Sequence, residues 1–365
     1  MNRLKRFFAM TLCLALVVVC FAGCHKKGEI AVTVGDVSFT SGYYACALVY
    51  ADIEARSIVE DQLSEQGELP AEIKYWDYKI EDTDYVTWVE NAAITNLKKI
   101  AAVRTRCAEV NPKIELTAED KSMAKTNADY LWDTYGYSEL MEKNGVSKET
   151  FIAYMQDGYL SDNYFDYIYG KGGSKAVSDE QISKQLSENY ALVNIINVDL
   201  SSLSESEIVK TTEKFTAYEK ELKAGTKTFE EVYTAYYYPN GEKHEHEEPA
   251  EGESAPQDAH ATILGNDTTD YSSDNYEKAK AMKVGEVTLL QLEETKGLAL
   301  IVKKDIMADP YYIEALDTNL RHEVVGDEYE ADVMKFAAEL ALVVNKSSTK
   351  QFKVKKIYYP EVVGY

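Results

Sequence analysis

The spacing of hydrophobic and polar positions changes several times along this chain, and each change marks an expected element. Residues 30–34 alternate in hydrophobicity before a Gly-Asp pair, which predicts a short strand and a turn. Residues 41–60 repeat apolar and aromatic side chains with the period of a helix, whereas residues 61–84 are polar and mixed and predict a loop or a broken helix. A second helical pattern covers residues 86–110 and stops before Pro112, because proline disfavours helix continuation.

Further helices and a linker complete the first half of the chain. Thr117 with Asp120 three residues later forms a loose capping box, which marks a helix start. Residues 151–168 place aromatic and aliphatic side chains on one broad helical face. The Lys-Gly-Gly-Ser stretch at residues 171–174 has the composition of a linker, and we place a domain boundary there.

The middle of the chain has a different pattern, in which short helices alternate with apolar strands. Three helices open with capping boxes, which are Ser178 with Gln181, Ser204 with Glu207, and Thr228 with Glu231. Residues 192–200 are typical of a buried strand, residues 261–265 predict a second, and two more strands meet at a turn at Lys296-Gly297. Residues 241–259 form an acidic, histidine-containing loop of low complexity. The order β-α-α-β-α-β-β fits one compact domain.

The last part of the chain returns to helices, which the pattern continues to about residue 344. Apolar residues within 352–357 then alternate with lysines, which predicts a terminal strand. Helices therefore flank a β-containing middle on both sides. We predict an α+β fold in which residues 28–175 and 308–361 form one mainly helical domain and residues 176–306 form a second domain inserted into it.

The N-terminus has the layout of a bacterial lipoprotein signal. Three basic residues at positions 3, 5 and 6 precede an apolar run over residues 7–21, and two small residues stand directly before Cys24. The segment resembles the lipobox of such signals, although Phe21 replaces the usual leucine. It predicts that residues 1–23 are a signal peptide and that Cys24 receives a diacylglyceryl group, whose two chains hold a protein stably at a bilayer.

Two other interpretations of the N-terminus stay open, an ordinary secretory signal and an uncleaved membrane anchor. The apolar run is short for a spanning helix, which needs about 20 residues. We therefore expect a lipid-anchored protein at the extracytoplasmic face of a bacterial membrane.

The charge balance narrows the class of partner. The net charge is −23, and loss of the three basic signal-peptide residues makes it −26 in the mature protein. A nucleic-acid partner is excluded as a working hypothesis, because Lys and Arg hold phosphate backbones. The negative charge also argues against adhesion through anionic headgroups, which leaves the lipid on Cys24 as the anchor. Cys46 and Cys107 form a disulfide or stay free, and the oligomeric state, a homodimer included, stays open.

Few residues suggest a metal site or an enzyme nucleophile. His244 and His246, with the later His260 and nearby glutamates, are candidate ligands, but a solvated loop is the favoured interpretation because no fixed element holds them. We expect no metal and no cofactor, since the chain also lacks a phosphate loop and a CxxC pair. Three consecutive tyrosines follow the third of the capping boxes, and three adjacent rings cannot all face one core. These tyrosines are therefore the candidates for peptide binding: Tyr236, Tyr237 and Tyr238.

Several motifs, taken in order, resemble the extracytoplasmic foldases of the PrsA and SurA type. Those proteins interrupt a helical chaperone domain with a parvulin-type peptidyl-prolyl isomerase domain. The matching segments are residues 32–36, 144–151, 177–182, 229–232, 264–265 and 279–287, the last (AKAMKVGEV) being similar to the parvulin pattern A-F-A-L-K-x-G-E-V. The resemblance implies a SurA-N-like chaperone domain, an inserted parvulin-like domain, and unfolded or newly translocated polypeptides as partners.

Departures from the parvulin pattern bear on activity. Parvulins carry a histidine on the first strand and another on the last, where this chain has Asn194 and Ala299. The cysteine or aspartate that the family carries after the second helix falls near Tyr238-Pro239. The resemblance therefore implies a chaperone whose parvulin-like domain is weak or inactive. The alternatives are an active parvulin-type isomerase and a solute-binding lipoprotein of an importer, although the repeated βα units of that last class are not found.

Overall fold

The structure, a computed structural model, describes residues 28–67, 70, 72–240, 256, 258–265, 273–292 and 296–360. The expected signal peptide, Cys24, His244 and His246 lie outside these residues. The chain divides into two compact units. Unit 1 consists of Met1–Ile168 and Asp327–Tyr365, and unit 2 consists of Tyr169–Gly326. Both ends of the chain thus contribute to unit 1, while the domain limits expected at residues 175 and 308 stay predictions.

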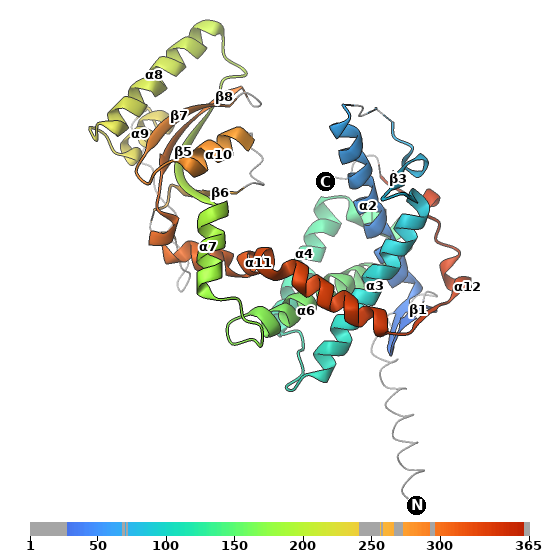
Figure 1. Ribbon diagram of the computed structural model, residues 1–365. Helices are drawn as coiled ribbons and strands as arrows, with labels where there is room; N and C mark the ends of the chain where they lie inside the picture. Colours follow the sequence, from blue (N-terminus) through green and yellow to red (C-terminus); the bar gives the residue numbers. More distant parts are fainter. Residues whose placement is uncertain are drawn as a thin grey trace, which may run out of the picture. The chain divides into compact units, whose positions relative to one another are not determined.

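Unit 1 is mainly helical and contains two small antiparallel sheets (Figure 1). Its elements in chain order are β1 (Ile30–Val34), β2 (Val37–Thr40), α2 (Ser41–Glu65), η2 (Tyr75–Asp77), β3 (Lys79–Ile80), β4 (Thr83–Asp84), α3 (Tyr85–Glu109), α4 (Ala118–Thr134), α5 (Tyr137–Lys143), α6 (Lys148–Tyr169), β9 (Leu342–Val344), α12 (Lys346–Thr349) and η4 (Val354–Lys356). The helix α11 (Pro310–Glu339) begins in unit 2 and ends in unit 1. The larger sheet has the order β2-β1-β9, so β1 lies between two strands.

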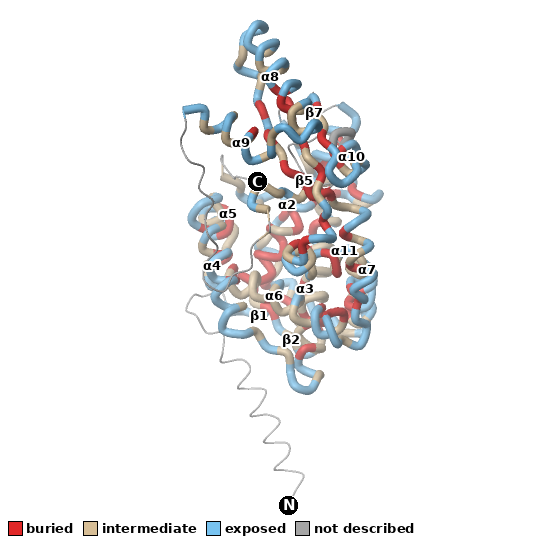
Figure 2. The backbone as a smooth tube through the Cα atoms, turned by 90° about the vertical axis from the view of Figure 1, so that its left-hand side faces the viewer, coloured by how far each residue is buried: buried red, intermediate tan, exposed pale blue. Residues whose placement is uncertain are grey.

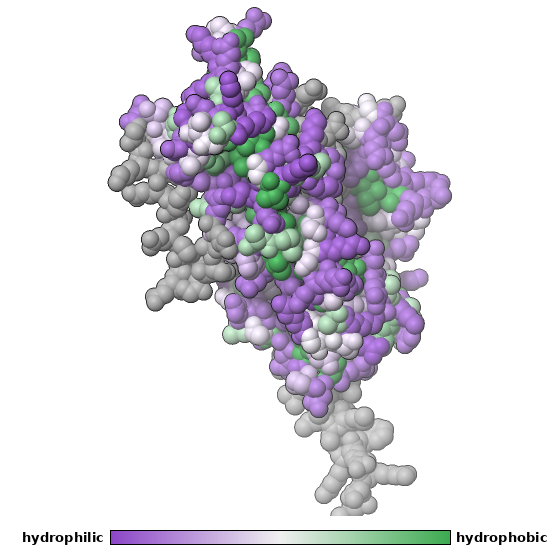
Figure 3. Space-filling view, turned by 60° about the vertical axis from the view of Figure 1, so that its left-hand side comes forward, coloured by the Kyte–Doolittle hydropathy of each residue, from purple (hydrophilic) through white to green (hydrophobic). Residues whose placement is uncertain are grey.

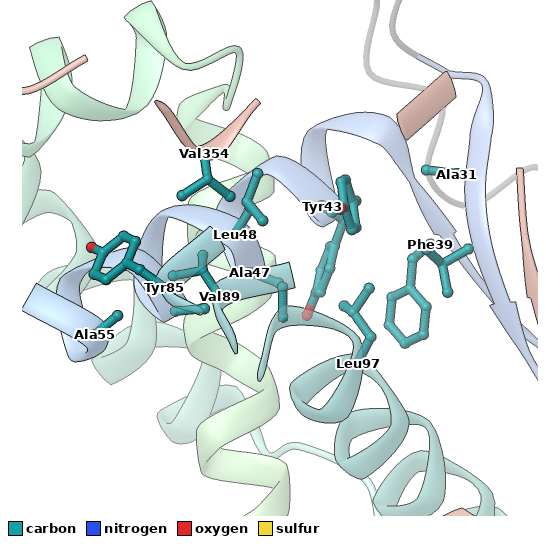
Figure 4. Packing of buried hydrophobic residues seen from close by; sticks show 14 of the residues in the cluster. Ala31, Phe39, Tyr43, Ala47, Leu48, Ala55, Tyr85, Val89, Leu97 and Val354 are labelled. Atoms are coloured by element: carbon teal, nitrogen blue, oxygen red, sulfur yellow. The ribbon is translucent and has the colours of Figure 1, made fainter. Parts of the chain in front are cut away.

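The core of unit 1 forms where α2 meets the sheet and α3. Thr40 caps α2 by accepting a hydrogen bond from the amide of Tyr43 at 3.3 Å. The first turns of α2 are buried on almost every side because the sheet and other helices cover them. In Figure 4, Leu97 of α3 lies beside Phe39, and Val354 of the C-terminal segment lies beside Leu48 of α2.

A buried carboxylate fastens the end of the chain to this core. Asp52, which is 1% exposed, accepts hydrogen bonds from Arg56 at 2.9 Å, from the Tyr85 hydroxyl at 2.9 Å and from the Tyr359 hydroxyl at 2.8 Å. The Arg56 guanidinium also lies 3.8 Å from the centre of the Tyr359 ring. A buried carboxylate needs this many donors because an unpaired charge in the interior is costly.

Two sequence predictions for unit 1 are wrong in part. Residues 61–84 are not only loop, because α2 continues to Glu65 and the hairpin β3–β4 follows. The expected terminal strand at residues 352–357 is a short 3-10 helix, and the third strand of the sheet is Leu342–Val344 instead. The lysine alternation misled the prediction, since it reflects one buried side chain, Val354, between exposed lysines and not a strand.

Unit 2 contains a four-stranded antiparallel sheet with helices on both faces. Its elements are α7 (Asp179–Asn189), β5 (Ala191–Asp199), α8 (Glu205–Lys223), α9 (Phe229–Tyr237), β6 (Ala261–Leu264), α10 (Ser273–Ala281), β7 (Val287–Leu292), β8 (Gly297–Lys303), η3 (Ile306–Ala308) and the first part of α11. The strand order is β6-β5-β8-β7, and every pair is antiparallel. The element order that the sequence predicted for this part is confirmed.

Each face of the unit 2 sheet carries its own apolar cluster. Ile196, Val198 and Leu300 pack with α8 and α9 on one face, while Val193 and Ile301 pack with α10 on the other. The central strand β5 is therefore buried on both faces, as its apolar sequence predicted, and Figure 2 shows it in contrast to the exposed outer turns of α8.

A buried arginine connects α11 to the first segment of unit 2. Arg321 of α11 is 1% exposed, and it donates hydrogen bonds to the carbonyl oxygens of Tyr169 and Val177, each at 3.1 Å. It also pairs with Asp317 through two hydrogen bonds of 2.8 and 2.9 Å. The fork of the guanidinium thus joins the part of α11 that lies in unit 2 to the segment that precedes α7.

The α+β class predicted from the sequence is confirmed. Among the described residues all strand pairs are antiparallel, which disfavours the two parallel α/β lobes of a solute-binding lipoprotein. Within the same residues no helix has the length and apolarity that a membrane span requires.

Cys46 and Cys107 are buried and free. The face shown in Figure 3 is mostly hydrophilic, in keeping with an acidic, solvated surface.

We expect Tyr359→Phe to lower the free energy of unfolding of unit 1 by about 1.5–2 kcal/mol, because it removes a hydrogen bond to the buried carboxylate of Asp52 and keeps the ring over Arg56. Urea denaturation, monitored through the hydrogen exchange of backbone amides in α2 and α3, measures this loss. The control is Tyr358→Phe, which removes an exposed hydrogen bond to Glu139 and should cost less than about 0.5 kcal/mol. Equal costs for the two variants would show that the Asp52 contact does not hold the C-terminal segment.

Candidate functional site

A polar centre interrupts the apolar central strand of unit 2. Asn194 lies in the middle of β5 and is 3% exposed, on the face that carries Ile196 and Val198. Its side-chain amide donates a hydrogen bond to Oδ2 of Asp258 at 2.9 Å. This contact fixes the amide orientation, since an ionised carboxylate only accepts hydrogen bonds. The Asn194 Oδ1 atom is then buried without a hydrogen-bond partner among the described residues.

Asp258, just before β6, gathers three donors. Its Oδ2 accepts from the Lys304 ammonium at 2.7 Å as well as from Asn194, and its Oδ1 accepts from the backbone amide of His260 at 3.0 Å. Burial raises the pKa of this carboxyl, but the hydrogen bonds from Lys304 and Asn194 outweigh it and leave the pKa below its ordinary value. Asp258 is therefore ionised at neutral pH and forms an ion pair with Lys304.

The two cations near the end of β8 have different roles. Lys304 follows β8, and its backbone amide donates to the Leu192 carbonyl at 2.8 Å, which extends the pairing with β5 and brings the ammonium to Asp258. Lys303 points to the other side, where its ammonium donates to the carbonyl oxygens of Ala279 at 3.3 Å and Lys280 at 3.4 Å. Only Lys304 therefore belongs to the polar centre.

A row of aromatic side chains borders the polar centre. The helix α9 begins with the capping box of Thr228 and Glu231 and presents Phe229, Tyr233 and Tyr237 along one side. The ring of His260 lies 4.3 Å from the Tyr233 ring and 5.6 Å from the Phe229 ring, and the Tyr233 and Tyr237 rings lie 4.6 Å apart. We call these four residues the aromatic row. They supply apolar area next to the polar groups.

The favoured interpretation of His260 as part of a solvated loop is wrong. Its side chain is 9% exposed, and Nε2 contacts the Glu230 carboxylate of α9. The histidine is fixed because α9 and the start of β6 lie together. No group of three or more His, Cys, Asp and Glu side chains within the described part of the chain has the arrangement of a metal site.

The three adjacent tyrosines occupy different environments. Tyr236 packs against the core with its ring 4.9 Å from that of Phe215, whereas Tyr237 is 44% exposed and donates to the Asn197 carbonyl at 3.4 Å. Tyr238 is half-buried at the C-terminal end of α9. The interpretation that the three rings do not share one core agrees with this arrangement. Tyr237 is the ring of the three that offers an open surface, while a role in peptide binding stays a prediction.

The strand register separates Asn194 from Ala299. Asn194 lies opposite Val302, and Ala299 lies opposite Asn197, so the two residues are on opposite faces of the sheet. Ala299 packs in the apolar cluster beside α10. The β8 side chains on the face of Asn194 are apolar (Leu298, Leu300 and Val302). Ala299 is therefore not the missing side of a network around Asn194.

The partner of Asn194 comes from a residue that the motif comparison did not select. The family pattern places a cysteine or aspartate near Tyr238-Pro239, whereas the carboxylate that contacts Asn194 comes from Asp258, three residues before the start of the sheet-edge strand β6. Asp258 ends a long acidic stretch in which no periodicity distinguishes one carboxylate from another. The signal that could have identified Asp258 was its position in the sequence. Because Ala261 pairs with Asn194, a residue just before β6 must lie near Asn194.

The arrangement supplies hydrogen bonds of both kinds beside apolar rings. The buried Oδ1 atom of Asn194 is a hydrogen-bond acceptor, and the Lys304 ammonium is a hydrogen-bond donor. The aromatic row offers apolar area that suits the side chains of a bound chain. A peptide bond presents one N–H and one carbonyl oxygen, so this set is complementary to extended polypeptide. The Asp258 carboxylate already accepts three hydrogen bonds within the described residues of the centre.

We expect Asp258→Asn to destabilise unit 2 most at pH 7. The folded pKa of Asp258 is below its unfolded value of about 3.9, so its contribution is complete above that value and is lost as the pH falls through the folded pKa. Thermal denaturation of both proteins between pH 7 and pH 2 should show melting temperatures that converge at low pH. The control, Glu213→Gln on the exposed surface of α8, should give a small and constant difference. A difference for Asp258→Asn that does not change with pH would rule out the ion pair.

No family model matches the sequence, and no curated protein matches it. Solved structures do. The foldase protein PrsA from Streptococcus pneumoniae is 11% identical, with a TM-score of 0.39, over 72% of this chain and 89% of that chain. PrsA from Lactococcus lactis is 14% identical, with a TM-score of 0.39, over 89% of this chain and 99% of that chain. PrsA from Bacillus subtilis is 14% identical, with a TM-score of 0.29, over 68% and 87%. At low sequence identity, the chain is similar in structure to PrsA foldases over most of its length.

Proposed function

We propose that this protein is a lipid-anchored, extracytoplasmic foldase that binds unfolded or newly translocated polypeptides, and that its parvulin-like unit has weak or no isomerase activity. One observation carries the proposal. The central strand of unit 2 holds a buried acceptor, Asn194 Oδ1, that has no partner among the described residues and borders the Lys304–Asp258 pair and the aromatic row.

The polar centre suits a peptide backbone better than a small charged solute. Lys304 and Asp258 neutralise each other, so the centre has no excess charge to attract an ion. The buried amide oxygen of Asn194 gains a hydrogen bond only when a donor such as a peptide N–H reaches it. Tyr237 and Tyr233 offer apolar area with polar tips, which bind side chains without demanding one sequence.

The same centre is unsuited to accelerating isomerisation. Rotation about an X-Pro bond crosses a barrier of about 18–20 kcal/mol, because the planar amide is stabilised by resonance that places negative charge on its oxygen. A cation that binds this oxygen stabilises the planar ground state more than the twisted transition state. Catalysis requires the opposite preference. The cation of the centre is Lys304, which is paired with Asp258, and β8 adds only Leu298, Leu300 and Val302 on this face.

The N-terminal sequence supports the location. The basic residues, the apolar run and the small residues before Cys24 fit export followed by lipid attachment. The first described strand, β1, begins at Ile30, so a lipid on Cys24 would leave five residues between the anchor and this strand. Light scattering of the purified protein distinguishes a monomer from the homodimer that the sequence leaves open.

We expect Cys24→Ala to release the protein from the membrane fraction or to leave it as an uncleaved precursor, because no other residue can accept the diacylglyceryl group at this cleavage site. Detergent phase partition and the mass of the N-terminal peptide measure the outcome. Cys20→Ala is the matched control, since it removes a thiol from the apolar run and keeps Cys24. Normal lipid labelling of the Cys24→Ala variant contradicts the anchor.

We expect the full chain to suppress aggregation of an unfolded, reduced test protein and to leave its X-Pro isomerisation within about twofold of the uncatalysed rate. Asn194→Ala should weaken binding of the unfolded chain about fivefold, the value of one hydrogen bond of about 1 kcal/mol. Glu213→Gln on α8 should bind as the unchanged protein does.

Two outcomes of this experiment contradict the proposal in different ways. Strong acceleration of isomerisation that Asn194→Ala abolishes makes the protein an active isomerase. Failure to bind any unfolded chain removes the foldase function altogether.

A further inference from the structure

A cluster of five lysines near the end of the chain reverses the sign of the protein's charge locally. The lysine cluster consists of Lys346, Lys350, Lys353, Lys355 and Lys356, all of them exposed. Residues 340–360 contain these five lysines and no Asp or Glu, although the whole chain has 62 acidic and only 39 basic residues. A segment this free of carboxylates in so acidic a chain is a distinct surface with its own electrostatic preference.

Neighbouring carboxylates neutralise the lysine cluster only in part, since Lys355 contributes to lowering the pKa of the exposed Asp84 carboxyl without forming an ion pair with it. Within the described residues none of its five ammonium groups forms an ion pair, whereas Lys99, Lys148 and Lys304 each do. The five lysines line a groove of about 720 Å³ together with Val344, Phe352 and other residues, and Glu90 is the one acidic side chain among the residues that line it. The positive charge is therefore available to an external anion.

The backbone that carries the lysine cluster is fixed to the core of unit 1. Val354 is 5% exposed and packs in the hydrophobic core of unit 1, and Ser348 of α12 is fully buried. Asn345 caps α12 by accepting a hydrogen bond from the amide of Ser347 at 3.1 Å. The lysines thus project from a held scaffold, which lowers the entropy lost when they bind together.

The lysine cluster begins next to the point where the chain leaves its expected anchor. The strand β9 pairs with β1 so that Val344 lies opposite Val32, and the amide of Asn345 donates to the Ala31 carbonyl at 2.8 Å. Figure 1 shows α12 beside β1. Residues 25–29 separate Cys24 from Ile30, which bounds the reach from a lipid on Cys24 to the start of β1 at about 20 Å.

We propose that the lysine cluster binds the anionic phospholipid headgroups of the bilayer that holds the lipid on Cys24; this inference rests on the proposed anchor. Lysines near an anionic surface are attracted over about 8 Å at physiological salt, so a short tether is needed to keep them within that range. Next to them, Leu342 and Val343 are 42% and 63% exposed and add apolar contact at the interface. The anionic surface repels the acidic residues elsewhere in the protein, so these residues then face away from the bilayer.

This assignment revises the expectation that net charge argues against headgroup contact. That expectation treats the −26 charge of the mature chain as uniform, whereas the carboxylates are absent from residues 340–360. Attraction at one face and repulsion elsewhere orient a tethered protein. Unit 1 would then present one fixed side to the membrane.

The test uses the full lipidated chain in vesicles of phosphatidylcholine alone and in vesicles that also contain phosphatidylglycerol. An amine-reactive reagent labels accessible lysines, and mass spectrometry follows each site. We expect labelling of the lysine cluster to slow about fivefold on the anionic vesicles and to recover in high salt. Lys210 and Lys220 of α8 should label at the same rate on both. Addition of inorganic phosphate to the neutral vesicles should give no protection.

Charge-reversal variants provide the second measurement. Lys353→Glu with Lys356→Glu should abolish the protection of the remaining cluster lysines, whereas the matched pair Lys210→Glu with Lys220→Glu, of equal charge change, should leave it intact. The mass of the Cys24 peptide is read in the same samples. A lipidated chain without protection on anionic vesicles, or with equal protection by phosphate alone, overturns the lysine-cluster proposal and leaves the anchor standing. An unmodified Cys24 overturns the anchor itself.

Discussion

The pairing of β1 with β9 is the constraint on which the rest of unit 1 depends. It joins residues 32–34 to residues 342–344, so the sheet is complete only after the whole of unit 2 has been made. Asp52 adds a second tie of the same kind, because its donors include Tyr359 from the end of the chain. Such long-range contacts close large loops and contribute to stability only late in folding. Unit 2, whose sheet contacts lie within its own residues, is free of this delay.

Unit 2 builds its polar centre from segments that the sheet itself brings together. Asn194 is on the central strand, Asp258 lies three residues before the start of the strand that pairs with it, and Lys304 directly follows the strand on its other side. The three side chains therefore meet for the same reason that the strands pair. The Tyr312 hydroxyl of α11 donates to the Ala261 carbonyl at 3.2 Å and adds a contact to the start of β6.

The sequence predicted the elements of both units better than it predicted their contacts. Capping boxes at Thr117, Ser178 and Thr228 located helix starts that the structure confirms, since these are local interactions between residues three apart. The choice of Leu342–Val344 as the third strand depends on which segment reaches β1, and no local pattern encodes that. The opposite faces of Asn194 and Ala299 follow from a register that motif spacing alone does not give. Asp258 was hidden for the same reason, because its role depends on where β6 pairs.

The polar side chain of Asn194 adds little net stability to unit 2. Its amide gains one hydrogen bond to Asp258, worth about 1.5–3 kcal/mol for a charged acceptor, but its buried oxygen loses water without replacement, at a cost of about 1–3 kcal/mol. The two terms nearly cancel, whereas an aliphatic residue of similar size would pack against Ile196 and Val302 with a clear gain. Under the proposed function, a peptide N–H that reaches this oxygen would supply the missing hydrogen bond, and we expect Asn194 to contribute most in the peptide-bound state.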